Sequence, residues 1–339
     1  MSEHDLTIIG DGVVAWACAH RLAVAGRRVL VLGAGDPPAS LAAAGMIAPA
    51  SEAVLDGVDA STAQLWRRSA EAWRALSAEL GISLRQTGTL HLADAAELER
   101  RAEIARSLGF AASRSSDGLL LADDMLIEPS AALRALRGAA LAAGAVFRRA
   151  RAPAAPDLAQ QTEATLRGGR VLIAAGWGAA ALTAWAPELA ALHPIRGQLL
   201  RVAAPDARGP MLRAQGVYLA PQTGGWSVGA TMEPGRSDLE PDPARSTELL
   251  AAAAALRPEL ADAPFAPVVG VRAATQDGAP LIGPSRTPGV LLATGLRRNG
   301  WLLAPLVAQV IAAYEDGDPD AVLGGQAHAW APARVLQTP

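Results

Sequence analysis

The sequence contains no lysine, so each of its 30 basic residues is an arginine. A chain without lysine has no lysine side chain for Schiff-base or general-base chemistry. It also has a single cysteine, Cys18, which excludes an intramolecular disulfide and is typical of a protein in the reducing cytoplasm. Because Cys18 falls inside the first expected helix, we predict a small core residue rather than a nucleophile.

Long apolar runs and a strong excess of one charge are missing as well. The 339 residues are 51% hydrophobic and 19% charged, with a formal net charge of −3. No apolar run approaches the ~20 residues that a membrane span requires. Without a basic run, nucleic acid is not an expected partner, and no spacing of His, Cys and acidic residues indicates a metal site. The first strand is expected by residue 6, which leaves no room for a signal peptide and predicts a soluble, cytoplasmic protein of two lobes.

The opening stretch has the pattern of a βαβ unit. Leu6–Ile9 is a short apolar strand, and Gly10–Ala15 reads G-x-G-x-x-A. A helical segment follows and ends at Gly26, and Arg28–Leu32 forms a second apolar strand. Between a strand and a helix, this turn predicts a dinucleotide site at the helix N-terminus, and an ordinary tight turn is the alternative.

The glycine turn has most of the features that a dinucleotide needs. Gly10 allows the tight turn, Gly12 lets a pyrophosphate approach the backbone, and the small Ala15 lets helix and strand pack closely. The second strand should end in an acidic residue that binds the ribose hydroxyls, but Gly33 stands there. Loss of such a charged hydrogen bond costs about 1.5–3 kcal/mol, and Asp36 in the next loop is one candidate to replace it.

Strands alternate with helices at both ends of the chain, and the middle is rich in strands. This order predicts an α/β nucleotide-binding domain that carries a mixed-sheet substrate domain. Ser61 and Gln64 form the start of a capping box for the second long helix, and the chain after Glu315 looks loosely packed. The expected helices are 61–80, 94–108, 128–143, 244–256 and 299–314. The expected strands are 84–92, 145–147, 169–175, 195–202, 217–220, 226–230, 268–272 and 290–294.

Three further segments carry a family resemblance. Residues 38–49 read PASLAAAGMIAP, residues 270–280 read GVRAATQDGAP, and residues 294–305 read TGLRRNGWLLAP. They resemble, in order, the small-residue loop, the GLRP-x-T-x-DG-x-P segment and the TGHFRNGILLAP segment of FAD-dependent amine oxidoreductases. Within the D-amino acid oxidase superfamily, the chain is most similar to the glycine oxidases of the thiamine pathway. Smaller matches lie at 122–129, 194–198, 217–221 and 229–232.

The resemblance implies a D-amino acid oxidase-like α/β fold with FAD as the cofactor. A Rossmann-like FAD-binding domain would comprise residues 1–80, 125–190 and 275–330. A mixed β-sheet substrate-binding domain would comprise 81–124 and 191–274, and 331–339 would form a tail. The implied FAD-binding residues are Gly10, Gly12, Val13, Val14, Ala15, Gly33, Ala34, Ala39, Ser40, Ala43, Ala44, Gly45, Met46, Gly176, Leu296, Arg297, Arg298, Asn299, Gly300, Trp301 and Leu302. Small side chains suit a flat isoalloxazine ring, and the N-terminus of the last helix suits an anionic reduced flavin.

The resemblance also implies a reaction in which a small amino acid loses a hydride to the flavin. The imino acid hydrolyses, and oxygen regenerates the flavin and yields hydrogen peroxide, with no catalytic acid or base. Arg272 would bind the substrate carboxylate, Tyr218 would donate its hydroxyl to it, Met232 would line the pocket, and Arg298 would lie near substrate and flavin. Each has a structural alternative, as a sheet ion pair, a core tyrosine, a core methionine or a loop cap.

The chain departs from the family pattern at several positions besides Gly33. Leu296 and Arg297 replace a His-Phe pair, Trp301 replaces a small aliphatic residue, and the stretch between Phe147 and Val171 is short for the usual pair of strands. Three functions follow: an oxidase of glycine, sarcosine or small D-amino acids; a dehydrogenase with another electron acceptor; and a non-catalytic relative with weak flavin binding. Family members are often tetramers, so a homo-oligomer is among the expected assemblies.

Overall fold

A six-stranded sheet contains the opening βαβ unit. In the computed structural model, which describes residues 4–153 and 170–336, the strand order is β17-β18-β10-β1-β2-β9. All neighbours are parallel except β17 and β18. The strands are β1 Leu6–Ile9, β2 Val29–Gly33, β9 Val146–Arg149, β10 Arg170–Ile173, β17 Leu281–Pro284 and β18 Val290–Thr294. This sheet confirms the predicted Rossmann-like arrangement.

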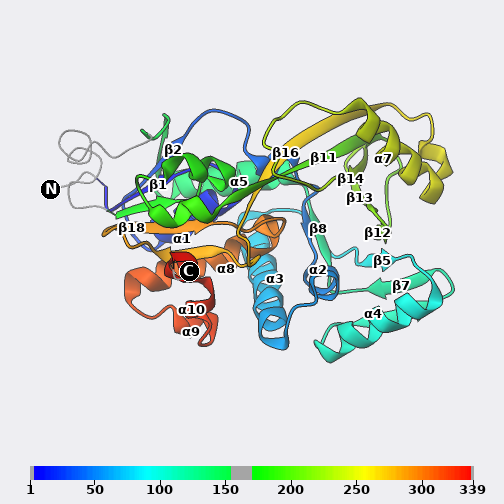
Figure 1. Ribbon diagram of the computed structural model, residues 1–339, viewed down its shortest axis with the longest axis horizontal. Coiled ribbons are helices and arrows are strands. Elements are labelled where there is room, and N and C mark those ends of the chain that lie inside the picture. Colours follow the sequence, from blue (N-terminus) through cyan, green and yellow to red (C-terminus); the bar gives the residue numbers. More distant parts are fainter. Residues whose placement is uncertain (1–3, 154–169, 337–339) are drawn as a thin grey trace.

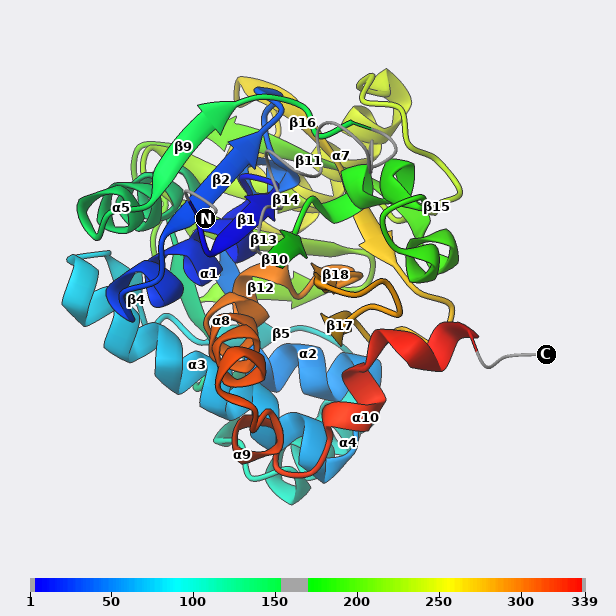
Figure 2. The ribbon, with the colours of Figure 1, turned by 90° about the vertical axis from the view of Figure 1, so that its left-hand side faces the viewer.

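Helices cover one face of this sheet. α1 (Val13–Val24) packs between α5 (Pro129–Ala142) and α8 (Gly300–Asp316), as Figure 2 shows. α1 carries buried residues along nearly its whole length, including Cys18, because a central helix has neighbours on several sides. The other face packs against the 3₁₀ segments η2 (Gly176–Leu182) and η3 (Pro187–Ala191).

A second, nine-stranded sheet is mostly antiparallel and lies beside the first (Figure 1). Its order is β15-β11-β14-β13-β12-β5-β7-β6, with β16 paired to β11. The strands are β5 Thr89–His91, β6 Ala112–Ser115, β7 Gly118–Leu121, β11 His193–Ala203, β12 Met211–Ala214, β13 Val217–Gln222, β14 Gly225–Gly229, β15 Glu233–Pro234 and β16 Phe265–Ala274. The strands of the two sheets come from the segments predicted for the two domains, whose boundaries remain a prediction.

The pleat of the second sheet separates its two faces. Leu200, Val228 and Leu219 stand in one row across β11, β14 and β13, and they pack with residues of α7 (Pro243–Leu256). The next row, Leu199, Gly229 and Tyr218, points to the opposite face because successive side chains alternate. One face is therefore core, and the other is turned toward the nucleotide-binding sheet.

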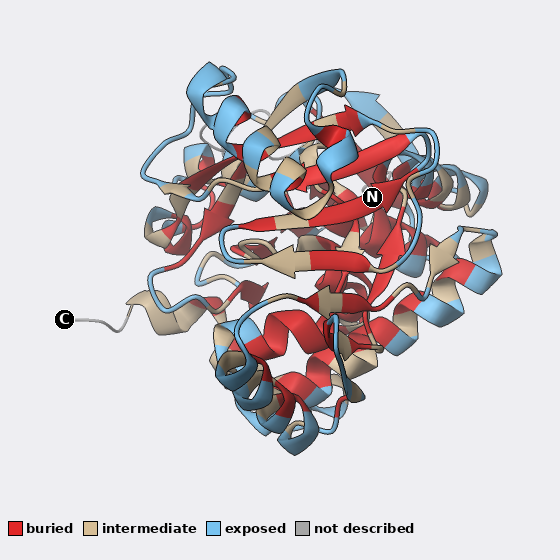
Figure 3. Cartoon of the chain, turned by 90° about the vertical axis from the view of Figure 1, so that its right-hand side faces the viewer, coloured by how far each residue is buried: buried red, intermediate tan, exposed pale blue. Residues whose placement is uncertain are grey.

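The remaining elements are a small third sheet, helices and 3₁₀ turns. A three-stranded sheet is formed by β3 Met46–Ile47, β8 Met125–Ile127 and β4 Leu84–Arg85. The remaining helical elements before η5 are α2 Pro49–Asp56, α3 Ala60–Leu80, α4 Ala95–Ser107, α9 Asp320–Leu323, α10 Ala327–Trp330 and the 3₁₀ turns η1 Ala39–Ala42 and η4 Pro258–Leu260. Exposed residues gather on outer helices and loops, and buried ones follow the strands (Figure 3). None of the described helices is long and apolar enough to cross a membrane.

Two local predictions are wrong. The N-cap of α3 is Asp59, whose side chain accepts a hydrogen bond from the Thr62 amide, so the capping box proposed for Ser61 and Gln64 does not form. The strand expected over 84–92 is divided into β4 and β5, because Gly88 adopts a positive φ of 64° between them.

The C-terminal chain also differs from its prediction. The helix expected at 299–314 is α8, but two short helices and the turn η5 (Pro332–Leu336) follow it. Leu323 and Trp330 are buried in the main core, so the expectation of a loosely packed segment after Glu315 is wrong. Most of the short stretch between Phe147 and Val171 lies outside the described residues.

Candidate functional site

A cavity of about 1160 Å³ is lined by residues of both large sheets. Its walls are the glycine turn after β1, the loop after β2, the start of η2, the inner face of β11, β13, β14 and β16, and the first turn of α8. Of all the predicted site residues, only Ala15 and Gly33 do not line it. The structure thus brings together segments that are spread over almost the whole sequence.

The glycine turn closes the sheet end of the cavity. Gly10 has a φ of 124°, and a Cβ there would overlap the carbonyl oxygen of Ala174 on the neighbouring strand. An L-residue at this position would therefore be both strained and blocked. Val13, the first residue of α1, donates its amide to Ser40 Oγ at 3.0 Å, which ties the turn to the small-residue loop. Ala15 is fully buried behind the turn, where a larger side chain would push helix and sheet apart.

The small-residue loop is held by long side chains from the second sheet. Arg201 donates to the carbonyl oxygens of Ala43 at 2.8 Å and Leu41 at 3.3 Å. Gln222 donates its amide to the carbonyl oxygen of Ala44. These bonds satisfy backbone acceptors that no regular element would satisfy, so they fix the loop against the cavity.

The first turn of α8 is tied to the same loop. The indole of Trp301 donates to the carbonyl oxygen of Ser40 at 3.0 Å, and the carbonyl of Trp301 accepts from the Trp73 indole at 2.5 Å. Asn299 is the N-cap and makes no side-chain capping bond. The helix N-terminus therefore presents unpaired backbone N–H groups and the positive end of its dipole at the cavity wall.

Arg272 and Tyr218 project from the inner face of the second sheet. Tyr218 on β13 lies opposite Gly229 on β14, which lies opposite Leu199 on β11. Arg272 on β16 lies opposite Ile195, which is four residues before Leu199 on the same strand β11. Residues four apart on a strand share a face, so both side chains point to the cavity side. A Cβ on Gly197 would lie 2.6 Å from the Arg272 Cζ, which shows that the guanidinium lies directly over this glycine.

The Arg272 guanidinium has no ion-pair partner among the residues that the structure describes. It donates a long hydrogen bond, 3.4 Å, to the carbonyl oxygen of Thr231. Burial is the main cause that lowers the pKa of Arg272, and the nearby Arg298 and Arg297 act in the same direction. A desolvated cation at a cavity wall, without a counter-ion, favours an anionic ligand.

A substitution at Gly197 tests whether the Arg272 guanidinium depends on the space above this glycine. We expect Gly197→Ala to displace the Arg272 guanidinium, because the new Cβ would occupy its place while the strand itself keeps its pairing. The apparent KM for an anionic substrate should rise roughly tenfold, since one good charge-assisted contact is worth about 1.5–3 kcal/mol and part of it is lost. Steady-state kinetics give the KM, and thermal unfolding of the same variant checks the fold. An unchanged KM would show that the arginine does not depend on this glycine.

A cluster of paired acidic residues and arginines at the cavity wall was not predicted. Glu52 on α2 is buried and pairs with Arg213 at 2.9 Å and with Arg298, whose second contact is Asp56 at 2.8 Å. Asp56 also pairs with Arg297 at 3.3 Å. Arg298 and Arg297 thus lie at the cavity wall, where two acids of one short helix pair with them, and their binding roles stay predictions.

The helix that carries these acids is capped from a distant segment. Asp124 accepts hydrogen bonds from the amides of Ala50 and Ser51 in the first turn of α2, at 2.9 and 3.3 Å, and from the Ser51 hydroxyl. His91 Nε2 lies 2.8 Å from Ser51 Oγ, and its Nδ1 lies 3.1 Å from Arg101. Arginine only donates, so His91 accepts at Nδ1 and donates from Nε2. The Ser51 hydroxyl donates to Asp124 and is fully buried. Ser51, His91 and Asp124 therefore position α2 and do not form a nucleophilic triad.

The buried histidine predicts a pH dependence of stability. Burial is the largest cause that lowers the pKa of His91 to about 3, from an ordinary value of 6.5. Below pH 6.5 the unfolded chain binds a proton that the folded chain excludes, so stability falls as the pH falls. Between pH 7.5 and 5 this amounts to roughly 2 kcal/mol. The pKa of Asp124, raised by burial to about 6, acts in the opposite direction.

The His91 contribution can be isolated by comparison with His91→Gln. Asp124 is present in both proteins, so its effect largely cancels in the difference. We expect the stability advantage of the wild type to shrink by about 2 kcal/mol from pH 7.5 to pH 5. Urea unfolding at several pH values measures this, and a constant difference would contradict a neutral buried His91.

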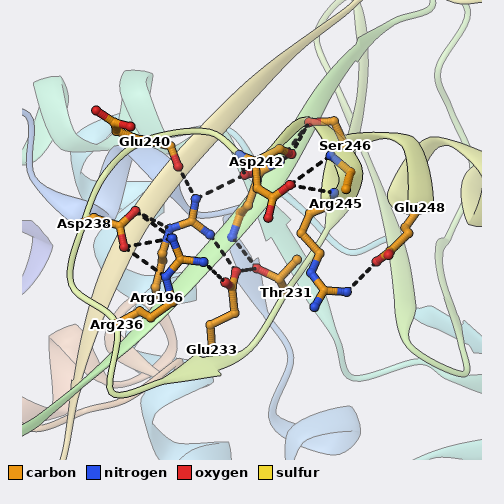
Figure 4. A network of polar contacts seen from close by, with 12 residues as sticks. Arg196, Thr231, Glu233, Arg236, Asp238, Glu240, Asp242, Arg245, Ser246 and Glu248 are labelled. Atoms are coloured by element: carbon orange, nitrogen blue, oxygen red, sulfur yellow. Dashed lines mark hydrogen bonds and ion pairs between the residues drawn. The ribbon is translucent and has the colours of Figure 1, made fainter.

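The outer edge of the cavity is held by a polar network around Arg196 (Figure 4). Arg196 is fully buried and pairs with Glu233 at 2.6 Å and Asp238 at 3.2 Å. Gln198, on the same face, donates to the carbonyl of Asp242 and to Ser246 on α7. The network fixes the segment 231–242, from which Met232 and Leu239 reach the cavity with 41% and 63% of their surface exposed. Met232 therefore lies at the open edge of the cavity, and its contact with a substrate stays a prediction.

Known proteins are similar to this chain over most of its length. The family model DAO, described as FAD dependent oxidoreductase, matches residues 5–314. The glycine oxidase of Geobacillus kaustophilus is 30% identical over 91% of this chain and 92% of its own. The bifunctional protein ThiO/ThiG of a Nostoc species is 29% identical over 91% of this chain, which spans 52% of that longer protein. The crystal structure of glycine oxidase from Geobacillus kaustophilus has a TM-score of 0.82, at 26% identity, over 93% of this chain and 95% of that chain.

Proposed function

The chain belongs to the DAO family of FAD dependent oxidoreductases, and from this membership we propose that it oxidises a small amino acid. The proposed substrates are glycine, sarcosine or a small D-amino acid, and the proposed products are the imino acid, which hydrolyses, and hydrogen peroxide. We further place this reaction in thiamine thiazole synthesis in the cytoplasm, and the relatives named glycine oxidase and ThiO/ThiG support the thiamine role. The enzyme is an FAD-dependent oxidoreductase, and its substrate and electron acceptor are the proposed part.

The residues present fit FAD. The cavity reaches from the glycine turn to the inner face of the second sheet, and its size suits a dinucleotide with a small substrate. The turn at Gly10 and Gly12 and the N-terminus of α1 would receive the pyrophosphate. The small-residue loop from Ala39 to Ala44 would lie against the isoalloxazine ring, since four of its six residues are alanine and the loop lines the cavity.

The substrate would be held by its carboxylate. Arg272 would form a paired, charge-assisted contact, and the Tyr218 hydroxyl would donate from the same face of the sheet. Burial raises the pKa of Tyr218, so its hydroxyl keeps its proton and acts as a donor. Arg298 would border the substrate while Glu52 and Asp56 hold its guanidinium in place.

When bound, FAD supplies the hydride acceptor for the substrate α-carbon. The protein's part is then to orient the α C–H bond and to stabilise the negative charge that develops on the acceptor. The unpaired N–H groups at the start of α8 are suited to the second task. No side chain is required to take the α-hydrogen as a proton, because this hydrogen leaves as a hydride with its electron pair while the lone pair of the neutral substrate amine forms the C=N bond.

One observation carries the proposal: the Arg272 guanidinium lies over Gly197 at the cavity wall and forms no ion pair with a carboxylate of residues 4–153 or 170–336. The flavin-loaded protein, mixed in air with glycine, sarcosine and D-alanine in turn, should release hydrogen peroxide with at least one of them. Consumption of substrate only with an artificial electron acceptor would favour the dehydrogenase. Absence of turnover with every substrate and acceptor would refute the enzymatic proposal.

A further inference from the structure

The second strand of the nucleotide-binding sheet ends without the acid that normally binds ribose hydroxyls. Gly33 closes β2, and a Cβ there would lie 2.5 Å from Asp11 Oδ2 and 2.8 Å from the Phe147 ring. The side-chain position beyond Gly33 is therefore filled. What fills it is a carboxylate, supplied by the residue between the two glycines of the turn.

Asp11 faces the cavity at the place where the missing acid would act. Asp11, Leu32 and Ala34 line the cavity, whereas Gly33 lies beneath and does not. The turn and the end of β2 are adjacent because β1 and β2 pair in parallel register. The Asp11 carboxylate, which follows β1, therefore lies at the carboxyl end of β2. This is the place where a dinucleotide ribose is bound.

The surroundings of Asp11 leave its carboxylate available for a ligand. Among the described residues it forms no ion pair, and burial is the main cause that raises its pKa. The charge of Arg137 acts in the opposite direction and lowers the pKa of Asp11. The Arg137 guanidinium lies over the Phe147 ring, 4.2 Å from the ring centroid. The alternative acid Asp36 is exposed and already pairs with Arg151.

We propose that Asp11 binds the ribose hydroxyls of the adenosine half of FAD and that Gly33 is required to leave room for it. An acidic residue of β2 is replaced by an acidic residue of the preceding turn, so the contact is kept while its position in the sequence changes. This proposal rests on FAD as the cofactor but on neither the substrate nor the electron acceptor. The role predicted for Asp36 passes to Asp11.

Binding of ADP to the flavin-free protein tests the contact without any turnover. We expect Asp11→Asn and Asp11→Ala to weaken ADP by about 10- to 100-fold, which is the value of one charge-assisted hydrogen bond. The wild type should bind ADP about 10-fold or more tightly than 2′-deoxy-ADP, and both variants should lose most of this preference. Asp36→Asn is the matched control and should bind both nucleotides as the wild type does.

Titration calorimetry gives these affinities, and circular dichroism shows whether each variant is folded. FMN, which lacks the adenosine half, should bind the wild type and the Asp11 variants equally. Equal ADP affinity in the wild type and both Asp11 variants would overturn the proposal. A loss confined to Asp36→Asn would overturn it too. Neither outcome bears on substrate oxidation, so this proposal can fail while the proposed function stands.

Discussion

Replacement of Glu52 by glutamine is expected to lower the free energy of unfolding by about 3–5 kcal/mol. Glu52 is buried and bridges Arg213 and Arg298, and these two contacts join α2 to the second sheet and to the start of α8. The positive charges of the two arginines lower the pKa of this carboxyl against the effect of burial. Without the acid, two partly buried guanidinium groups would repel each other, so removal of one partner costs more than the net value of the pair.

Urea unfolding of the flavin-free protein measures this effect. The matched control is Glu248→Gln, which removes an exposed acid that pairs with Arg245 on α7 and should change stability by less than about 1 kcal/mol. Equal stabilities of the two variants would show that the Glu52 cluster contributes no more than a surface pair. We also expect Glu52→Gln to raise the KM, because Arg298 loses its fixed position.

The second large effect is expected for Arg272→Ala. Loss of the guanidinium should lower kcat/KM for the amino acid by roughly 30- to several-thousand-fold, which corresponds to about 2–5 kcal/mol for a desolvated charge pair. Most of the change should appear in KM. Flavin content should stay the same, because Arg272 projects from the second sheet and not from the segments proposed to hold the cofactor.

Flavin absorbance per protein and steady-state kinetics separate the two readings of Arg272. Arg245→Ala serves as control, since Arg245 is exposed on α7 and pairs with Glu248 one helical turn away. Loss of flavin in Arg272→Ala, with unaltered KM in the remaining loaded protein, would mean that this arginine supports the fold and does not bind substrate.

Local patterns in the sequence were sufficient for the fold class. The βαβ unit, the last apolar strand and the glycine turn follow from short-range periodicity and turn chemistry, and they were predicted. The family segments located the loop at 38–49, the Arg272 strand and the start of α8. The structure brings these three to one cavity, and the comparisons confirm the FAD-dependent oxidoreductase fold.

Contacts between distant residues could not be predicted. Arg213 and Arg298 meet Glu52 across 161 and 246 residues, and Asp124 caps α2 from 73 residues away. None of these pairs leaves a periodic or local signature in one sequence. Asp11 was a similar case: the empty acid position at Gly33 was visible, but only the side-chain geometry shows which residue fills the space above it.

Burial of the C-terminal segment also depends on contacts between residues that are distant in the sequence. Two four-residue helices broken by glycines have too little periodicity to predict a packed element. Leu323 and Trp330 are nonetheless buried, and Arg334 pairs with Asp277 at 2.7 Å, which fastens the segment to the loop before β17. Tertiary contacts, and not helix propensity, place this part of the chain.

Hydride transfer from a small amino acid to the protein's own FAD can be observed directly as flavin reduction. The flavin-loaded protein is mixed anaerobically with excess glycine, sarcosine or D-alanine while the flavin absorption band is followed. We expect at least one of them to bleach the band, with one flavin reduced per substrate oxidised and full recovery on admission of air. A flavin that dithionite reduces but that no small amino acid bleaches would refute the proposed oxidation.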